Sequence, residues 1–305
     1  MLLTSDFVKS RYEALRARAP DLQVVTDIEG ASDPDVTALF AFKLPAGIAP
    51  RLPNLRLAAS VGAGADGILS APDLQPNVKV TRAVEPGLGF SMAQFVSLQI
   101  LRHFRSLPLM ERQHAASEWK RLAVPDASQV TVGIMGLGSI GSVVADALVA
   151  LGFNVIAWTR TSAREARVPV FVGEGQKDDF LSRSNYLVCL LPFTPETKGS
   201  LDRASLSKLP KGSFLVNVAR GGIVVEDDLL ALVNDGHLAG AALDVFATEP
   251  LPADSPFWCH ERILVTPHIA AQPTVGPVVD QFLENLRCLA QGQPLLNEVD
   301  RNIGY

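Results

Sequence analysis

The chain has 305 residues, and its 27 lysines and arginines against 32 aspartates and glutamates give a net charge of −5 and an acidic isoelectric point near 5.6. This balance argues against a nucleic-acid partner, because phosphate backbones are bound by basic surfaces. With 48% hydrophobic residues and ordinary amounts of glycine and proline, the composition excludes collagen-like and largely disordered chains and indicates one large or two smaller globular domains.

Several features bear on location. Apolar runs fall far short of the roughly 20 residues of a membrane helix, so we expect no spanning segment and no membrane partner. Charged residues from Asp6 onward interrupt the N-terminal segment before a secretory hydrophobic region could form. The chain has only three cysteines, an odd number, which fits a reduced cytoplasm; they are Cys189, Cys259 and Cys288. Their spacing is not that of metal ligands, so we expect no metal site.

Short apolar or β-branched runs alternate along the chain with amphipathic stretches. This alternation is typical of parallel βαβ units and predicts an α/β fold. Several runs are apolar throughout, as expected for strands that are covered on both faces. The expected strands are residues 23–26, 38–42, 55–60, 78–81, 130–135, 155–158, 186–191, 214–217, 240–245 and 263–266.

A domain boundary is expected near residues 85–89, where EPGLG interrupts the pattern before a long helix that begins at Ser91. A last helix over about 277–291 should return to the N-terminal part of the chain. We therefore expect two Rossmann-like, doubly wound parallel-sheet domains with the active site in the cleft between them. The first comprises residues 1–90 with 275–305, and the second comprises residues 91–274.

A glycine turn follows the expected strand 130–135 and opens an apolar helix. Its residues are Gly136, Leu137, Gly138, Ser139, Ile140 and Gly141. The first glycine permits a tight turn, the second lets the backbone approach a pyrophosphate, and the third lets helix and strand pack closely. A plain glycine turn is the alternative, since this pattern alone is a weak signal. The strand, the helix and the following strand together favour a dinucleotide-binding domain over residues 91–274.

Thr159, Arg160 and Thr161 follow the next expected strand, where NAD-preferring sites usually place an acid for the ribose hydroxyls. A guanidinium flanked by hydroxyls would bind a 2′-phosphate through charge-assisted hydrogen bonds. We therefore predict a preference for NADP(H), with NAD(H) possible. Arg164 is a second, weaker candidate, and an ordinary surface role for Arg160 is the alternative.

Three segments in the second half resemble the D-isomer-specific 2-hydroxyacid dehydrogenases. They are NVARGG from Asn217, LDVFATEPL from Leu243 and TPHIAA from Thr266, and their order is also that of the family. With LLPFTPET from Leu190, the resemblance covers essentially the whole chain. SVGAGADGIL, WTRT and the terminal VDRNIGY are most similar to the glyoxylate/hydroxypyruvate reductase A branch.

Reduction of a 2-oxo acid needs a cation for the carboxylate and the ketone, and a proton donor that works near neutral pH. The planar fork of Arg220 suits the first task, and the imidazolium of His268 suits the second. The resemblance implies that Glu249 hydrogen-bonds His268 and stabilises its protonated form. An isolated histidine or glutamate would more simply be a loop residue, but the coincidence of three motifs favours catalysis.

The resemblance also implies further contacts. The backbone amides of Val61 and Gly62 would receive the substrate carboxylate, although this turn could simply join strand to helix. Phe42 would stand at the mouth of the site, with core packing as the alternative, and Asp244 would approach the nicotinamide carboxamide. The remaining expected cofactor contacts are Leu191, Pro192, Thr197, Val218, Ala219, His268 and Ala270.

Acidic residues 226–228 precede an expected helix and are explained by its dipole. The Pro- and Gly-rich segment 272–277 is unusual for the family, which leaves substrate contacts there in doubt.

Together these features predict NADPH-dependent reduction of small 2-oxo acids, glyoxylate to glycolate and hydroxypyruvate to D-glycerate. The family habit implies a homodimer, with residues 91–119 contributing to the contact. The alternatives are a dinucleotide-sensing regulator of the corepressor type, an enzyme for larger 2-oxo acids, and a phosphite or formate dehydrogenase.

Overall fold

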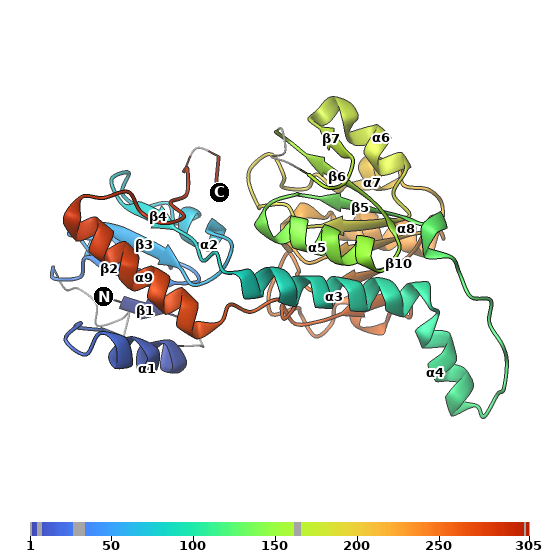
Figure 1. Ribbon diagram of the computed structural model, residues 1–305, viewed down its shortest axis with the longest axis horizontal. Coiled ribbons are helices and arrows are strands. Elements are labelled where there is room, and N and C mark those ends of the chain that lie inside the picture. The colour runs from blue at the N-terminus through green and yellow to red at the C-terminus, as the bar shows by residue number, and fades with distance from the viewer. Residues whose placement is uncertain (1, 5–7, 27–33, 162–165, 302, 305) are drawn as a thin grey trace. The chain divides into compact units, whose positions relative to one another are not determined.

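The computed structural model describes residues 2–4, 8–26, 34–161, 166–301 and 303–304 (Figure 1). The chain divides into two compact units, Met1–Leu88 with Gln272–Tyr305 and Gly89–Ala271, called here the smaller and the larger unit. Each unit has its own parallel sheet, which confirms the α/β class and the presence of two Rossmann-like sheets.

The smaller unit is built on a four-stranded parallel sheet in the order β1-β2-β3-β4. Apolar clusters lie on both faces of this sheet, and in one of them Phe40 stacks on Phe282 with ring centroids 4.5 Å apart. Its elements are β1 (Leu2–Thr4), α1 (Val8–Arg18), β2 (Ala38–Ala41), η1 (Ala49–Arg51), β3 (Leu57–Ser60), α2 (Asp66–Leu69), β4 (Lys79–Thr81) and α9 (Val275–Gln291).

The expected strand at residues 23–26 is wrong. The edge of the sheet is formed by β1, which pairs in parallel with β2. Leu22 and Val24 instead pack as partly buried residues against the apolar cluster around Phe40. Within this run only Val25 forms an isolated β-bridge, so the run packs on the core without forming a strand.

The long helix α3 (Pro86–Phe104) begins at Pro86 and not at Ser91. Proline is well suited to the first turn of a helix, where its missing N–H leaves no intrahelical bond unmade. The Glu85 carboxylate accepts the Gly87 N–H at 3.1 Å and the Thr274 N–H at 2.9 Å. EPGLG is thus a helix start, and Glu85 ties it to the segment that leads into α9.

The larger unit contains a seven-stranded parallel sheet in the order β11-β10-β9-β8-β5-β6-β7. From β5 the chain first builds outward through β6 and β7, then returns to place β8 on the other side of β5. Ligands of open α/β sheets bind at such a reversal, beyond the carboxyl ends of the strands. Apolar clusters cover both faces of the sheet.

The strands of the larger unit are β5 (Thr131–Met135), β6 (Asn154–Thr159), β7 (Val170–Val172), β8 (Tyr186–Cys189), β9 (Ser213–Asn217), β10 (Leu238–Leu243) and β11 (Ile263–Val265). The other elements are α4 (Leu107–Ala115), η2 (Ala127–Gln129), α5 (Ser139–Ala150), η3 (Glu174–Gln176), α6 (Lys177–Ser182), α7 (Arg203–Leu206), η4 (Gly221–Ile223), α8 (Glu226–Asn234) and η5 (Pro256–Cys259). Among these strands only β7 was not predicted from the sequence, because it is a three-residue edge strand without a buried residue.

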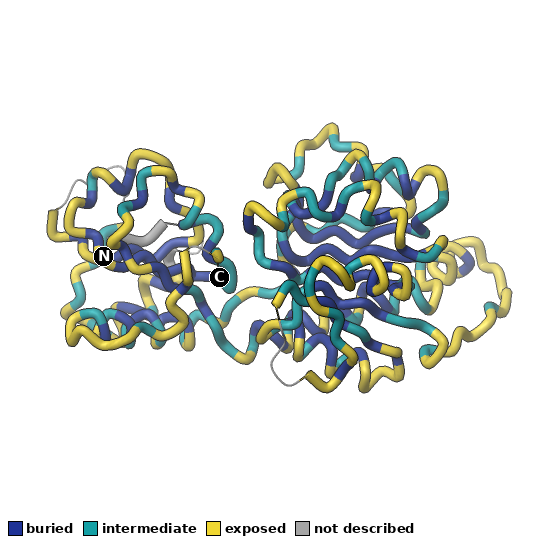
Figure 2. Tube along the Cα trace, turned by 90° about the horizontal axis from the view of Figure 1, so that it is seen from above, coloured by how far each residue is buried: buried dark blue, intermediate teal, exposed yellow. Residues whose placement is uncertain are grey.

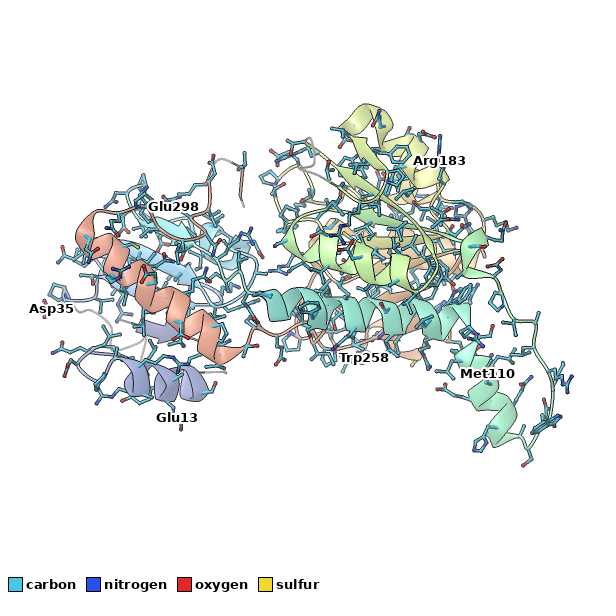
Figure 3. The ribbon with its side chains drawn as sticks, in the orientation of Figure 1. Glu13, Asp35, Met110, Arg183, Trp258 and Glu298 are labelled. Carbon is cyan, nitrogen blue, oxygen red and sulfur yellow. The ribbon has the colours of Figure 1, made fainter. Side chains whose placement is uncertain are left out.

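Helix α4 and the segment after it project from the body of the larger unit (Figure 1). The central strands of that unit, such as β8 and β9, are buried, whereas the projecting segment is exposed over most of its length (Figure 2). Met110 stands on α4 among the exposed side chains (Figure 3).

None of the helices in the described ranges is long and apolar enough to cross a membrane. Within the same ranges, no group of three or more His, Cys, Asp or Glu side chains could hold a metal ion.

Candidate active site

The glycine turn lies at the reversal of strand order, between β5 and the end of β8. Gly136 has a φ of +102°, and a Cβ on it would approach the Leu190 carbonyl oxygen to 2.8 Å. A Cβ on Gly141 would lie 2.0 Å from the Gly136 carbonyl oxygen, so this glycine brings α5 against the turn. At Gly138 a Cβ would meet nothing within 4 Å. The turn is therefore packed tightly at its two ends and open in the middle.

This geometry fits a dinucleotide pyrophosphate. Gly138 is the N-cap of α5, a helix of 12 residues whose first N–H groups lack intrahelical partners. The open space at Gly138 lets a phosphate reach those amides, and the positive end of the helix dipole favours its charge. Leu137, Ser139 and Ile140 are partly or fully exposed around the turn.

Arg160 follows β6 at the same carboxyl edge of the sheet. Its guanidinium Nη1 lies 3.4 Å from Oε2 of Glu196, in the loop after β8. The Thr159 hydroxyl donates to the Thr161 carbonyl oxygen and so closes the turn that carries Arg160. This edge thus holds a cation that already binds an oxyanion. Arg164, the weaker candidate, lies outside the described residues.

The other expected cofactor residues also follow strands of this sheet. Leu191, Val218, Ala219 and Ala270 are buried, and Pro192 is half-buried. The Thr197 hydroxyl donates to the Pro192 carbonyl oxygen at 2.7 Å and accepts the Thr194 N–H at 2.8 Å. Thr197 therefore fixes the loop after β8.

Arg220 follows β9 and is positioned by its neighbours in the chain. Its Nη1 donates to the Ala219 carbonyl oxygen at 2.7 Å, and its own carbonyl oxygen accepts from Asn217 Nδ2 at 3.2 Å. A Cβ on Gly221 would lie 1.8 Å from the backbone carbon of Phe246, so only glycine permits this approach. The close packing brings the Arg220 segment against the segment that carries Glu249.

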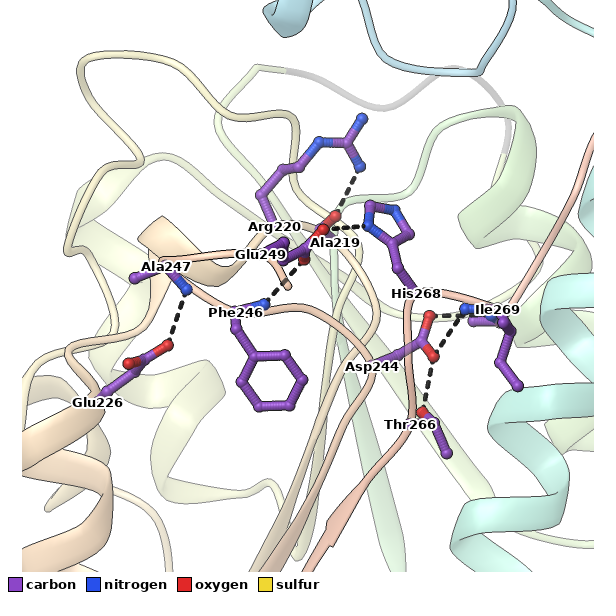
Figure 4. A network of polar contacts seen from close by, with 11 residues as sticks. Ala219, Arg220, Glu226, Asp244, Phe246, Ala247, Glu249, Thr266, His268 and Ile269 are labelled. Atoms are coloured by element: carbon purple, nitrogen blue, oxygen red, sulfur yellow. Dashed lines mark hydrogen bonds and ion pairs between the residues drawn. The ribbon is translucent and has the colours of Figure 1, made fainter. Parts of the chain in front are cut away.

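Glu249 and His268 form the centre of the site (Figure 4). Glu249 Oε2 lies 2.8 Å from His268 Nδ1, and Glu249 Oε1 accepts the Phe246 N–H at 3.0 Å. Partial burial acts to raise the pKa of Glu249, but the hydrogen bonds from His268 and Phe246 and the charges of His268 and Arg220 outweigh it, so this pKa lies below its ordinary value. The stabilisation it contributes is therefore present above the ordinary pKa and is lost as the pH falls through the lowered one.

Asp244 holds the loop that carries His268. Its carboxylate is 1% exposed and accepts three hydrogen bonds, from Thr266 Oγ1 at 2.6 Å, the Ile269 N–H at 3.0 Å and the Ala270 N–H at 2.8 Å (Figure 4). The His268 N–H donates to the Asp244 carbonyl oxygen at 2.8 Å. The sequence analysis expected Asp244 to approach the nicotinamide, but here both carboxylate oxygens are used to position the His268 loop.

Glu226 has a role that the sequence analysis did not assign. Its Oε1 accepts the Ala247 N–H at 2.8 Å (Figure 4). This bond holds the loop after β10, which also carries Glu249. The sequence offered only three successive acids at a helix start, which the helix dipole explains equally well. Nothing in that pattern distinguishes Glu226 from Asp227.

In the smaller unit, the turn after β3 is held by its own donors and acceptors. The Val61 N–H donates to the Ala41 carbonyl oxygen at 3.2 Å, and the Gly62 N–H donates to Ser60 Oγ at 3.2 Å. Both expected amides therefore already have acceptors. The next two amides, of Ala63 and Gly64, have no acceptor among the described residues.

Phe42 lies over this turn. A Cβ on Gly62 would come within 3.1 Å of its ring, and Phe42 is 43% exposed. It is therefore a surface aromatic beside the turn, and the core-packing alternative does not apply.

A dinucleotide-binding turn at the sheet reversal, with an arginine, a glutamate and a histidine on neighbouring loops, defines an NAD(P)-binding dehydrogenase. The family model for the NAD-binding domain of D-isomer specific 2-hydroxyacid dehydrogenases matches residues 97–270. The chain belongs to this family.

Curated relatives and solved structures agree with the assignment. The chain is 39% identical over 256 residues to a glyoxylate/hydroxypyruvate reductase A of Klebsiella pneumoniae, and the aligned region covers 82% of each chain. A D-isomer specific 2-hydroxyacid dehydrogenase from Xanthobacter autotrophicus, solved with NADPH and MES, is 38% identical with a TM-score of 0.92, over 100% of this chain and 98% of the other. An NADPH-dependent glyoxylate/hydroxypyruvate reductase from Sinorhizobium meliloti, solved with NADP and sulfate, is 35% identical with a TM-score of 0.90, over 100% and 99%.

The three hydrogen bonds that the Asp244 carboxylate accepts, called here the Asp244 clamp, give a first prediction. In Asp244→Asn, one carboxylate oxygen becomes an NH2 group that faces a donor instead of accepting from it. We expect the free energy of unfolding to fall by about 1–3 kcal/mol. We also expect kcat to fall about a hundredfold, because a shift of about 1 Å in the His268 loop has that effect on catalysis.

Urea denaturation and steady-state kinetics measure the two effects. Asp227→Asn is the matched control, because Asp227 is exposed on α8 and has no hydrogen bond or ion pair in the described structure. Loss of stability with an unchanged kcat would show that the clamp does not position His268.

Proposed function

We propose that this protein reduces small 2-oxo acids with NADPH, converting glyoxylate to glycolate and hydroxypyruvate to D-glycerate. The observation that carries the proposal is the Glu249–His268 pair, next to Arg220, at the carboxyl edge of a dinucleotide-binding sheet. The similarity to the Klebsiella and Sinorhizobium reductases supports this choice of substrates.

Each side chain has a separate task in this reaction. Arg220 binds the substrate carboxylate and polarises the ketone oxygen, which lowers the energy of the developing alkoxide. His268 Nδ1 is hydrogen-bonded to Glu249, so the proton for that alkoxide comes from Nε2. Glu249 stays ionised and accepts from Nδ1, which holds the ring with Nε2 available for the transfer. NADPH, when bound, supplies the hydride for the carbonyl carbon.

For the cofactor, we propose that the residues at 136–141 hold the pyrophosphate and that Thr159, Arg160 and Thr161 hold the 2′-phosphate. The open space at Gly138 and the anion already paired with Arg160 support this assignment. The dehydrogenases from Xanthobacter and Sinorhizobium were solved with NADPH and NADP respectively, which supports the same phosphate preference.

For the substrate carboxylate, we propose that the turn after β3 supplies amide donors. Val61 and Gly62 hold the turn in shape, since their N–H groups are already used, and the amides of Ala63 and Gly64 are the available donors. Phe42 covers the same turn and would restrict the size of the substrate.

The first test is the loss of NADPH absorbance at neutral pH with glyoxylate, hydroxypyruvate, pyruvate and a larger 2-oxo acid. We expect rapid turnover with the two small acids and a kcat/KM with NADPH about tenfold or more above that with NADH, because a charge-assisted contact to the 2′-phosphate has this magnitude. No turnover with any of the four acids, with NADPH binding retained, would favour a dinucleotide-sensing protein. A preference for NADH would contradict the role of Arg160.

The role of His268 is tested separately. His268→Ala should lower kcat for reduction by about 10²–10⁴-fold, because it removes the proton donor, while NADPH affinity stays nearly unchanged. His260→Ala is the control, since His260 lies in the same unit and, among the described residues, its ring bonds Asn234 and the Arg262 N–H. Equal rates for the His268→Ala variant and the wild type would remove His268 from the mechanism.

We also propose that the protein is a homodimer that pairs through residues 91–119. Large apolar side chains are exposed along this stretch, with Leu98 56% and Trp119 96% accessible. Exposed apolar side chains that gather on one segment are typical of an association surface. The projection of α4 from its unit gives a second copy access to it (Figure 3).

The double variant Leu98→Glu with Trp119→Glu should be a monomer in light scattering after size exclusion, because four charges would face one another or remain unpaired in the dimer. The wild type should have twice the mass of one chain. Trp258→Glu is the control, since Trp258 is also half-exposed in the larger unit but lies outside the stretch. A monomeric wild type, or a double variant that still dimerises, would contradict the proposed surface.

A further inference from the structure

The ion pair between Arg160 and Glu196 joins two loops at the carboxyl edge of the larger sheet. Arg160 follows β6, and Glu196 lies in the loop after β8. Their side chains are unequally exposed, with 33% of Arg160 and 60% of Glu196 accessible. The cation is therefore partly enclosed, whereas its anion reaches it from solvent.

The backbone that carries Glu196 is firmly held. The Thr194 carbonyl oxygen accepts the N–H groups of Thr197 and Lys198 at 3.1 and 3.0 Å, and the Thr197 hydroxyl closes the same turn. The turn below Glu196 is fixed by these bonds, so the carboxylate can leave Arg160 by rotation of the side chain alone. Displacing its carboxylate from Arg160 therefore requires no rearrangement of the loop.

Glu196 is ionised at neutral pH. The hydrogen bond from the Thr194 hydroxyl, together with the nearby Arg160 charge, holds the pKa of Glu196 below its ordinary value. A full negative charge thus stands at the guanidinium that the proposed cofactor site assigns to the 2′-phosphate.

We infer that Glu196 is a specificity-determining residue that competes with the 2′-phosphate of NADPH for Arg160. The inference rests on the proposed NADP(H) site. The Glu196 carboxylate occupies Nη1 of the guanidinium, and a carboxylate left beside the phosphate repels it. NADH has a hydroxyl at this position, so its binding leaves the ion pair in place. Glu196 therefore weakens the binding of NADPH but not that of NADH. It reduces the preference for NADPH over NADH that Arg160 creates.

The test compares the wild type with Glu196→Gln, which keeps the shape of the side chain and removes its charge. Dissociation constants for NADPH and NADH are measured by fluorescence titration at low and at high salt. We expect NADPH to bind about two- to fivefold more tightly to the variant, the range of an exposed ion pair, with NADH unchanged. The difference should shrink at high salt, because exposed charges are screened.

Glu174→Gln is the matched control, because Glu174 is an exposed glutamate of the same unit that pairs with Lys177. It should leave both affinities unchanged, and equal melting temperatures for all three proteins show that folding is unaffected. An unchanged or weaker NADPH affinity in Glu196→Gln would overturn the inference, as would equal tightening for NADPH and NADH.

The wild-type measurement tests the proposed cofactor choice by itself. If the wild type does not prefer NADPH, that proposal fails whatever the variant does. If the wild type prefers NADPH and the ratio of the two affinities does not rise in Glu196→Gln, the cofactor proposal stands and the competition by Glu196 does not.

Discussion

The buried carboxylate of Asp244 is the constraint on which the active site depends. A carboxylate removed from water must be met by donors, and the loop after β11 supplies three of them within five residues. The loop is thereby bound to the end of β10, with His268 at a left-handed φ of +54° between two of the donors. Such a conformation is costly for a residue with a side chain and persists only where its surroundings enforce it. The position of the His268 imidazole thus follows from the buried charge of Asp244.

The same loops approach one another only because particular side chains are missing. Gly221 lies against the backbone of Phe246, and Gly136 lies against Leu190, each at a distance that a Cβ would not allow. In both cases the contact joins loops that follow neighbouring strands of the sheet, β9 with β10 and β5 with β8. Residues far apart in the sequence therefore meet because their strands are neighbours, and the glycines set how closely. This is why the glycine positions carried so much of the information in the sequence.

The sequence predicted the α/β class, nine of the eleven strands in the described residues and the residues of the Arg220–Glu249–His268 cluster, because each has a local signature. It did not predict the start of α3, where Pro86 and two glycines look like a break until the Glu85 carboxylate is seen to accept an N–H of the helix. It also did not separate Glu226 from its acidic neighbours, because the bond to Ala247 depends on how two loops fold together. Hydrogen bonds between side chains and distant backbone amides leave no periodic pattern in the sequence. They are therefore the main features that the sequence did not predict.

The larger unit contains two cation–anion arrangements at one edge of its sheet, and their differences match different tasks. Around Glu249 the partners are partly buried and held by backbone donors, so the charge on the glutamate acts on His268 in a fixed geometry. At Arg160 the partner anion is exposed and reaches the cation by a flexible side chain, so another anion can replace it. Fixed charges favour a single protonation state and suit chemistry, because they require no reorganisation as the alkoxide develops. Replaceable charges suit a cofactor that must bind and leave in each cycle, because an anion of the protein takes the place of the phosphate on release and the cation is never left without a partner.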